Sequence, residues 1–543
     1  MSESTNKRQF SLENKEAHNN DHKSWSRRSF LHSLGLMGGA GVALGGFSVG
    51  AMASPSLLPS FLTEGPEDRI LVLIRLKGGN DGLNMVVPLF NYSEYASARQ
   101  TIKIPEDDII PLNDKFGLPV TMEKLTPLWN EGAMKVVNSV GYDNQNLSHF
   151  TSSDIWNSAN QNIQSSIDKS GWLGRYMLFQ DPDYLENLPD VPGAIKISSG
   201  GSISYHNPDQ IDLAVNFNTP DRLLQVAETG TVYDVNNLPD DCYYGEQVGY
   251  LRSILNVTYN FAPKISEAYN ALENSVAYSD NDLSRQLAIV ARLIKGGLGT
   301  RLYMVTLEGF DTHENQNDSH PLLMNYIASA VSEFYDDLKA SDLDNNVLAM
   351  TFSEFGRRIQ ENGSGTDHGA AAPLLMFGPE LNGSDVLGED PDFSDLDENA
   401  NLKHKTDFRE IYASILEYWL CLNPVDVDAI LGDSYNRIDN LGFVCDPISS
   451  TSAPVSQHVS HEVRQNPGGG VTIHYTLDRP GNINLTVYTI MGQKLETLHH
   501  GYQTSGQHQK EFVLSYSGLQ TLPLVYKLEA QGRVYSGKFI IPQ

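Results

Sequence analysis

Cysteine is scarce in this sequence, and its scarcity excludes several classes of protein. Only Cys242, Cys421 and Cys445 occur in 543 residues, and no two of them form a CxxC pair. This number and spacing exclude a disulfide framework, a zinc ribbon and a thioredoxin-like redox site. The chain also lacks the cysteine patterns that bind haem or Fe–S clusters. At most one disulfide is expected.

Basic side chains are also few. The chain has 38 Lys and Arg against 67 Asp and Glu, which gives a formal net charge of −29. Phosphate backbones repel such a chain, so nucleic acid is excluded as an expected partner, and anionic membrane surfaces are disfavoured.

The acidic residues are concentrated in the middle of the chain. Residues 1–53 and 455–543 are each close to neutral, whereas residues 54–454 carry 25 basic and 58 acidic side chains, a charge of −33. This distribution, together with the length of the chain, predicts separate pieces with different tasks.

The N-terminal piece has the features of an export signal. Arg27-Arg28 precedes an uncharged, glycine-rich run over residues 30–53 that ends in Ala51-Met52-Ala53. This pattern is typical of a twin-arginine signal peptide, so we predict that the protein leaves the cell folded and is secreted or held at the cell surface. The alternative is an uncleaved membrane anchor, but the run is too weakly apolar for a stable transmembrane anchor to be expected.

The C-terminal piece is predicted to be a small all-β sandwich. Residues 449–470 are rich in small and polar side chains and are interpreted as a linker, and residues 471–543 contain short alternating runs such as VTIHYTL and LVYKLEA. The layout, with its closing GKFII, resembles the type A C-terminal sorting domain of the type IX secretion system. That resemblance implies the type IX machinery as a partner, and the alternative is a carbohydrate-binding or spacer module.

The middle piece, residues 54–448, contains short apolar runs that are typical of buried parallel strands. Helical periodicity at residues 283–298 and 321–340 lies between them, which predicts an α/β fold whose mostly parallel sheet has helices on both faces. The five runs are RILVLIRL (69–76), MKVVNSV (134–140), RLYMVTL (301–307), NVLAMTF (346–352) and PLLMF (373–377).

Carboxylates and imidazoles follow these runs at the positions where strands end. Ligands of α/β sheets bind beyond the carboxyl ends of the strands, so we expect these side chains to gather at one edge. Mixed oxygen and nitrogen donors suit a divalent metal, which would be zinc, manganese, magnesium or calcium. The candidate metal ligands are Asp81, Asp311, His313, Glu354, Asp367 and His368.

The motifs LKGGNDGLN, NLSHFTSSDIW, GWLGRY, GFDTH, SEFGRR, GTDHGAAAPLLMFGP and TDFREIYASILEYWL resemble the domain of unknown function 1501 family, a branch of the alkaline phosphatase/sulfatase superfamily. The resemblance implies that Asp311, His313 and His368 bind a first metal and that Asp81 bridges toward a second. Glu354 stands where the superfamily has an Asp-His pair, and Phe355 replaces its His, so the second site is expected to be weak or absent.

The resemblance also implies a nucleophile at the start of a helix, which here is Ser148. A helix N-terminus favours a transferred anionic group, and a neighbouring metal would activate the hydroxyl. Ser148 as a simple helix cap is the competing interpretation, and Thr151 and Ser152 are alternative nucleophiles. No CxPxR sequence is present, so a formylglycine route is not supported. Arg357, or its neighbour Arg358, is predicted to clamp an anionic ester, with an ion pair as the alternative.

The acidic stretch at residues 380–400 is interpreted as a solvated loop, with a structural calcium site as the alternative.

Taken together, these features predict an exported, metal-dependent hydrolase of phosphate or sulfate esters, whose substrate is a small molecule or a glycan. The rival hypothesis is a cell-surface binding protein that keeps the fold without turnover. An oxidoreductase is disfavoured, because no GxGxxG follows the first strand.

Overall fold

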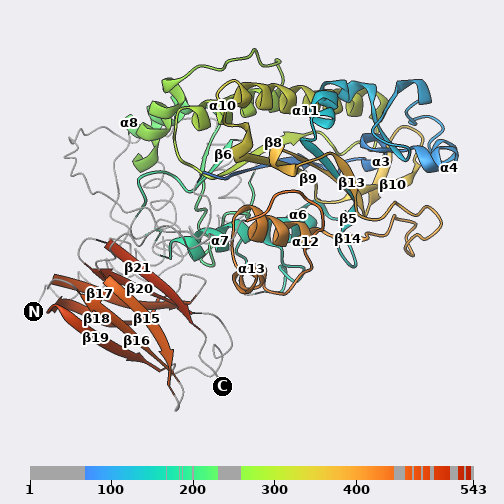
Figure 1. The fold of residues 1–543 in the computed structure, drawn as a ribbon. Coiled ribbons are helices and arrows are strands. Elements are labelled where there is room, and N and C mark those ends of the chain that lie inside the picture. Colours follow the sequence, from blue (N-terminus) through green and yellow to red (C-terminus); the bar gives the residue numbers. More distant parts are fainter. Residues whose placement is uncertain are drawn as a thin grey trace, which may run out of the picture.

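The computed structural model describes residues 68–229, 259–445 and 459–539, apart from short gaps at 167, 183, 186–187, 198–200, 467–469, 478–480, 490–493, 514–523 and 531–532. An α/β body carries the chemistry-bearing motifs, and a β-sandwich follows it (Figure 1). The predicted signal segment 1–53 and Cys242 lie outside the described residues. No helix among the described residues is long and apolar enough to cross a membrane.

A nine-stranded sheet forms the centre of the α/β body. All five predicted apolar runs are strands of this sheet. Its order is β13 (Asp385–Leu387), β5 (Met134–Gly141), β12 (Ala372–Phe377), β9 (Val347–Phe352), β1 (Ile70–Lys77), β8 (Leu302–Glu308), β6 (Ala194–Ile197) and β7 (Val215–Phe217), with β14 (Thr406–Asp407) paired to β5.

The sheet is mostly parallel, with one exception that matters for the site. β1 pairs in parallel with β8 and β9, but β12 runs antiparallel to both β9 and β5. The expectation of a parallel strand at residues 373–377 was therefore wrong. Because β12 runs the other way, the segment that leads into it lies at the edge where the parallel strands end.

Helices cover both faces of the sheet, as predicted. Alternate side chains of β1 divide between two cores: Val72 and Ile74 pack with α10 (Asp282–Lys295) and α11 (Gln316–Lys339), and Leu71 and Leu73 pack on the other face. That second core also takes side chains from α6 (His149–Ser158), α7 (Trp172–Gln180), α12 (Phe408–Ser414) and α13 (Pro424–Leu431).

α10 and α11 correspond to the two helices predicted at residues 283–298 and 321–340. α10 is capped by Asn281, whose side chain accepts a hydrogen bond from the Ser284 amide, and its buried face repeats Leu283, Leu287 and Val290. α11 begins at Gln316, five residues before the predicted start, so Pro321 lies in its second turn rather than at its beginning.

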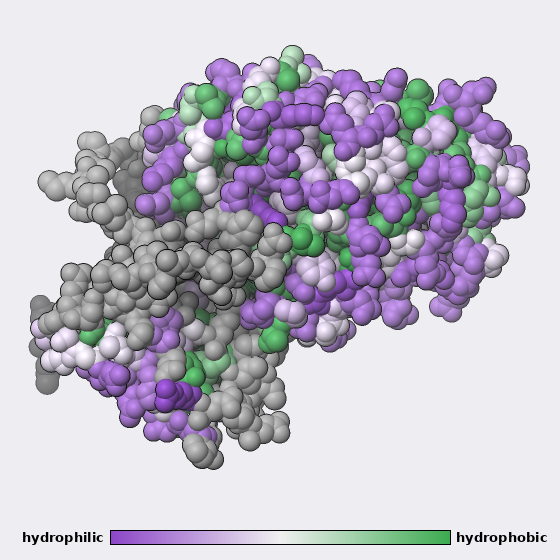
Figure 2. Space-filling view, viewed as in Figure 1, coloured by the Kyte–Doolittle hydropathy of each residue, from purple (hydrophilic) through white to green (hydrophobic). Residues whose placement is uncertain are grey.

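Smaller elements complete the body. β2 (Val87–Pro88), β4 (Phe116–Pro119) and β3 (Ile109–Pro111) form a small sheet, and β10 (Gly356–Glu361) pairs with β11 (Thr366–Gly369) as an antiparallel hairpin. Further helices are α3 (Gly82–Met85), α4 (Tyr92–Ala98), α5 (Thr126–Asn130) and α8 (Pro220–Thr229), and residues 259–271 are also helical. Hydrophilic side chains cover much of the visible surface of the body (Figure 2), in keeping with its acidic composition.

The C-terminal unit is an all-β sandwich, as predicted. One sheet contains β15 (Val459–Gln465), β16 (Val471–Leu477) and β19 (Gly506–Phe512), and the other contains β18 (Lys494–Gln503), β17 (Gly481–Thr489), β20 (Leu524–Ala530) and β21 (Arg533–Phe539). β15 lies inside the range assigned to the linker and pairs with β16, so the sandwich begins earlier than expected. β18 was also missed, because its side chains are mostly polar and exposed.

One disulfide joins Cys421 to Cys445, with their Cα atoms 5.5 Å apart. It ties the segment that follows α12 to the end of the α/β body.

Candidate metal centre

Glycines after β1 allow four segments to meet at the carboxyl edge of the sheet. Gly78 and Gly79 have φ angles of 126° and 78°, which are accessible to glycine and strained for other residues. A Cβ at Gly78 would lie 2.3 Å from the Asp311 amide nitrogen, and a Cβ at Gly79 would lie 2.2 Å from the Phe355 ring. The turn at Gly78 and Gly79 therefore packs closely against Asp311 and Phe355.

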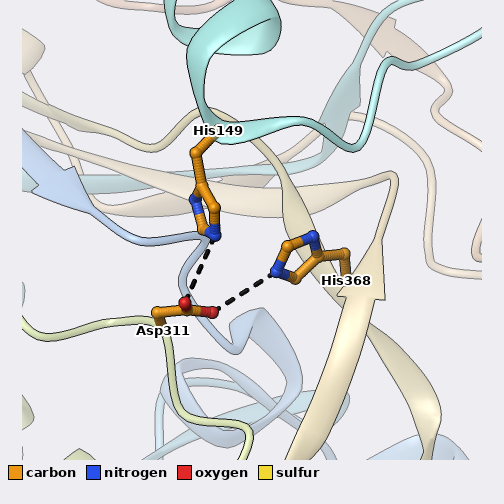
Figure 3. Close-up of side chains that lie close together, drawn as sticks. All are labelled: His149, Asp311 and His368. Carbon is orange, nitrogen blue, oxygen red and sulfur yellow. Dashed lines mark hydrogen bonds and ion pairs between the residues drawn. The ribbon is translucent and has the colours of Figure 1, made fainter.

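Asp311 lies at the centre of a cluster of imidazoles. It follows β8, while His149 is the first residue of α6 and His368 lies on β11. Figure 3 shows both imidazoles directed at the Asp311 carboxylate. Their potential ligand atoms all lie within 4.8 Å of one another, and no other such group of three or more His, Cys, Asp or Glu occurs in the described ranges.

The imidazoles present Nε2 atoms to the carboxylate. His149 Nε2 is 3.3 Å from Asp311 Oδ2, and His368 Nε2 is 3.3 Å from Oδ1. His313 adds a third imidazole, with Nε2 3.2 Å from Asp311 Oδ1 and 2.9 Å from His368 Nε2. His149 Nε2, His368 Nε2 and the Asp311 carboxylate thus form the group whose ligand atoms all lie within 4.8 Å of one another, and His313 lies next to this group.

The opposite ring nitrogen of each imidazole faces an acceptor. His149 Nδ1 is 3.1 Å from Glu354 Oε1, and His368 Nδ1 is 2.8 Å from the Leu147 carbonyl oxygen. His313 Nδ1 is 3.3 Å from Asp367 Oδ1. A carbonyl or carboxylate oxygen only accepts, so each Nδ1 is assigned its proton. Each Nε2 then carries a lone pair directed toward Asp311.

This donor set fits a divalent cation. Lone pairs and a carboxylate that face one another repel unless a positive charge lies between them, and imidazoles oriented through their second nitrogen are typical metal ligands. Zinc binds nitrogen and oxygen at about 2.0–2.1 Å, so neighbouring ligands of a tetrahedral site are about 3.3 Å apart. The N–O separations of 3.2–3.3 Å match that spacing.

The centre opens to solvent on one side. The side chains of Asp311 and His313 are 49% and 41% exposed, against 21% for His368. The hydrogen bond to Glu354 raises the pKa of the His149 imidazole, whereas burial lowers the pKa of His368. Burial alone would raise the pKa of Asp311, but the Arg357 guanidinium outweighs it and lowers the pKa. Asp311 is thus held as an anion that can bind a cation.

Arg357 does not adopt the predicted role of an anion clamp. Its side chain is fully buried, and its N–H groups are directed at the main-chain oxygens of Gly78, Gly79, Phe310 and Thr366 and at Asp311 Oδ1. The donors that would bind an ester therefore bind the protein. Arg357 instead holds the segments together beneath Asp311.

Asp81 is also placed differently from the prediction. Its carboxylate is fully buried, pairs with Arg99 Nη1 at 2.6 Å and accepts a hydrogen bond from Gln316. Burial raises the pKa of Asp81, and the ion pair with Arg99 more than reverses this effect. Asp81 is not in the group of converging ligand atoms; its Oδ2 is bound by Arg99 and Gln316, and its Oδ1 is buried without a hydrogen-bond partner.

Glu354 lies beside the centre, on the far side of His149. Its Oε1 accepts a hydrogen bond from the Gly78 amide at 2.9 Å in addition to the contact with His149. The ring of Phe355 packs against His149 and His368 at centroid distances of 4.9 and 4.4 Å. Phe355 therefore forms an apolar wall where the superfamily pattern has a ligand.

The hydroxyl groups predicted as nucleophiles lie around the start of α6. Ser148 is the N-cap residue, but its side chain makes no capping hydrogen bond, and the residue is exposed beside His149. Ser152 is buried, and its hydroxyl donates to the Glu354 carbonyl oxygen. Thr151 is half-buried. The structure therefore leaves Ser148 as the accessible candidate next to the cluster.

The acidic stretch at 380–400 contains the strand β13, which was not predicted, and is otherwise a turn-rich loop. Asp392 Oδ1 accepts from the Ser394 amide and hydroxyl, and Asp397 Oδ1 accepts from the amides of Asn399 and Asn401. These carboxylates stabilise turns of their own loop. The calcium alternative gains no support from the described residues.

His149 was missed in the sequence. The sequence predicted Ser148 as a hydroxyl at the start of a helix, but it did not predict a role for the imidazole of His149. The start of α6 brings both residues to the sheet edge. The signal was present in the motif NLSHF, which has a His directly at the predicted helix N-terminus.

Comparison with known families supports the resemblance seen in the sequence. Residues 262–420 match the model of the family described as "Protein of unknown function (DUF1501)". The matched range contains GFDTH, SEFGRR and GTDHG, and thus Asp311, His313 and His368. A comparison with curated proteins finds no match.

Solved structures of hydrolases share a low similarity with the chain. The PsFucS1 sulfatase from Pseudoalteromonas sp. has 9% identity and a TM-score of 0.30, with 75% of this chain and 78% of that chain covered. The phosphonate monoester hydrolase SpPMH from Silicibacter pomeroyi has 8% identity and a TM-score of 0.30, over 83% and 90% of the chains. An alkaline phosphatase from the Antarctic bacterium TAB5 has 11% identity and a TM-score of 0.23, over 59% and 94%.

Proposed function

We propose that this protein is an exported, metal-dependent hydrolase of phosphate or sulfate esters. The observation that carries the proposal is the convergence of three imidazole Nε2 atoms on the Asp311 carboxylate at a solvent-accessible sheet edge. A divalent ion bound there would polarise the ester and stabilise the negative charge that develops on its oxygens.

The residues of the chain have distinct roles in this proposal. His149, His313, His368 and Asp311 hold the ion, and the acceptors on their Nδ1 atoms fix the rings. Ser148 lies at the N-terminus of α6, a helix of ten residues, where free amide groups and the helix dipole favour an anionic group. Its hydroxyl, or a water molecule, would attack the phosphorus or sulfur atom as the bond to the alcohol oxygen of the ester breaks, and the alcohol would leave with the proton that the nucleophile gives up. If Ser148 attacks, a water molecule would then release the phosphate or sulfate from its hydroxyl oxygen.

Two observations support export. The sequence carries a twin-arginine pattern, and Cys421–Cys445 is a disulfide, a bond that persists mainly in oxidising compartments. Mass spectrometry of the mature protein tests the proposal, because a chain that still begins near Met1 would contradict a cleaved signal. Removal of residues 459–543 tests the sorting role of the sandwich, since unchanged secretion would exclude it.

The experiment that tests the activity combines metal analysis with an ester panel. Purified protein is expected to contain a divalent ion and to hydrolyse aryl phosphate or aryl sulfate esters, and Asp311→Asn is expected to bind the ion at least about 100-fold more weakly and to lose ester turnover. Asp318→Asn is the matched control, because Asp318 is an exposed carboxylate of α11. Bound metal without turnover of any ester would refute the hydrolase.

One observation favours the rival function, a cell-surface binding protein. Arg357, the side chain expected to hold an anionic ester, is buried and bound to main-chain oxygens. A binding protein would take up metal, and bind an anionic ligand through it, without releasing phosphate or sulfate.

A further inference from the structure

Glu354 makes contacts that are unusual for a buried carboxylate. Only 2% of its surface is exposed, and Oε1 receives both the Gly78 amide and His149 Nδ1. Its own main-chain oxygen is held by Ser152 and by Gln145 Nε2. Oε1 is thus fixed in position at one edge of one imidazole, and Oε2 is buried without a hydrogen-bond partner.

The edge that Glu354 contacts is the one remote from the centre. Nδ1 and Nε2 point out of different sides of an imidazole ring, and His149 Nε2 is the atom that faces Asp311. Glu354 Oε1 therefore lies behind His149 as seen from the ligand cluster. A carboxylate in this position sets the tautomer and orientation of a ligating histidine and raises its basicity.

We propose that Glu354 is a positioning residue that acts through His149, and that the centre holds one metal ion rather than two. The inference rests on the metal centre of the proposed function. It replaces the sequence-based assignment of Glu354 as a ligand of a second ion.

The described residues offer one group of converging ligand atoms, and it contains neither Asp81 nor Glu354. Asp81 Oδ2 is paired with Arg99 at 2.6 Å, and Asp81 Oδ1 is buried without a hydrogen-bond partner. The ring of Phe355 packs on His149 and His368. An apolar ring and a carboxylate paired with a guanidinium are a poor environment for a second divalent ion.

Glu354→Gln tests the proposal with little change in shape. The amide oxygen of Gln can still accept from His149 Nδ1, but it lacks the charge that raises the basicity of the ring. We expect the variant to bind Zn²⁺ about 10–100-fold more weakly, the usual cost of a lost outer-shell partner, with one ion per chain before and after the change. Competition against a chelator of known affinity measures the binding.

Glu308→Gln is the matched control. Glu308 is the last residue of β8, near the same sheet edge, where it pairs with Lys77 at 2.7 Å and is 57% exposed. The substitution removes the same charge without touching a residue of the centre, so Zn²⁺ affinity is expected to stay within about twofold. If Glu308→Gln lost as much Zn²⁺ affinity as Glu354→Gln, the loss would come from the removed charge alone and not from the contact with His149. That result would overturn the proposal.

A double-mutant cycle shows whether Glu354 acts through His149. If it does, Glu354→Gln costs little further Zn²⁺ affinity in a His149→Ala background. Full additivity would overturn the positioning role. Should Glu354→Gln fail to fold, ¹⁵N NMR of the histidine rings in the metal-free wild type replaces it, at a pH above the pKa of His149. A neutral His149 ring protonated on Nδ1 supports the proposal, and a neutral ring protonated on Nε2 contradicts it.

Failure of this inference and failure of the proposed function give different results. Two Zn²⁺ ions per wild-type chain, with one lost in Glu354→Gln, would make Glu354 a ligand and leave the hydrolase intact. One ion with the expected weakening, but no ester turnover, would support the positioning role and refute the hydrolase. A wild-type chain that binds no Zn²⁺ would refute both.

Discussion

Replacement of Asp311 by Asn is the most direct perturbation of the centre. Asp311 is the only carboxylate in the cluster of converging ligand atoms, and its two oxygens contact all three imidazoles. Asn keeps the shape and removes the charge. The ion would then face neutral ligands beside the Arg357 guanidinium, which lies 2.7 Å from Asp311 Oδ1.

The size of the effect follows from the linkage between metal binding and folding. A ligand present at 1,000 times its Kd stabilises a fold by about 4.1 kcal/mol. Loss of an outer-shell partner alone costs 10–100-fold in metal affinity, so loss of the anionic ligand is expected to cost at least about 100-fold. At the same Zn²⁺ concentration the stabilisation then falls to about 1.4 kcal/mol, a loss of about 2.7 kcal/mol.

Denaturant unfolding with and without Zn²⁺ measures this difference. The wild type and the Asp318→Asn control are expected to gain about 4 kcal/mol from the ion at that concentration, and Asp311→Asn about 1.4 kcal/mol. The metal-free variants are compared first, so that any change in intrinsic stability is separated from metal binding. Equal stabilisation of Asp311→Asn and the wild type by Zn²⁺ would refute the assignment of the centre.

Three further predictions concern groups outside the ligand set. Ser148→Ala is expected to lower ester turnover at least about 100-fold with unchanged Zn²⁺ affinity, because its hydroxyl is the accessible nucleophile; retained turnover would assign the attack to water. Asp337→Ala should lower the free energy of unfolding, measured with denaturant, by about 3–5 kcal/mol. In the wild type Lys295 Nζ lies 2.6 Å from Asp337 Oδ1, and the substitution leaves this buried charge without its carboxylate. Cys421→Ser should lower the free energy of unfolding by about 3 kcal/mol, because the disulfide to Cys445 closes a loop with a sequence separation of 24. Reduction of the disulfide in the wild type should have the same effect.

The Asp337 prediction has a pH dependence whose sign can be worked out. Burial raises the pKa of Asp337, but hydrogen bonds from Lys295 and Asn274 more than offset it, so the folded-state pKa is lowered. The stabilisation is therefore complete above the unfolded pKa of about 3.9 and is lost as the pH falls through the lower folded value. Asp337→Ala should remove this part of the acid dependence, and an unchanged acid profile would contradict the assignment. Lys295→Met combined with Asp337→Leu serves as the control, since it removes both charges together and should cost less.

The strands of the α/β body were predictable because their residues are apolar on both faces. RILVLIRL and RLYMVTL have almost no alternation, as expected for strands covered by helices on both sides, and both lie in the middle of the sheet. The direction of β12 was not predictable, because hydrophobic pattern contains no information on which way a strand runs. His368 lies at the carboxyl edge of the parallel strands because β12, the strand that follows it, runs antiparallel to them.

The group of residues around Asp311 was predictable only in part, for a related reason. Asp311, His313 and His368 lie close together, as expected, because strand ends collect at one edge, a rule that needs no knowledge of side-chain direction. Their role as metal ligands stays a prediction. Asp81 meets the same rule, yet its carboxylate faces a guanidinium from Arg99, 18 residues further along the chain. Which partner neutralises a carboxylate is a matter of tertiary packing that strand-end position does not determine.

The structure also changes what the acidity of the body implies. An anionic ester that approaches the opening meets Asp311 and Asp367, whose side chains are about half exposed, while Arg357 is buried and bound to main-chain oxygens. The positive charge that an ester requires must therefore come from a bound metal. Binding of metal and binding of anion are then coupled, and linkage is reciprocal: if the ion strengthens the binding of the ester, the ester strengthens the binding of the ion by the same factor. In a body of charge −33, the proposed metal centre would thus also be the anion site.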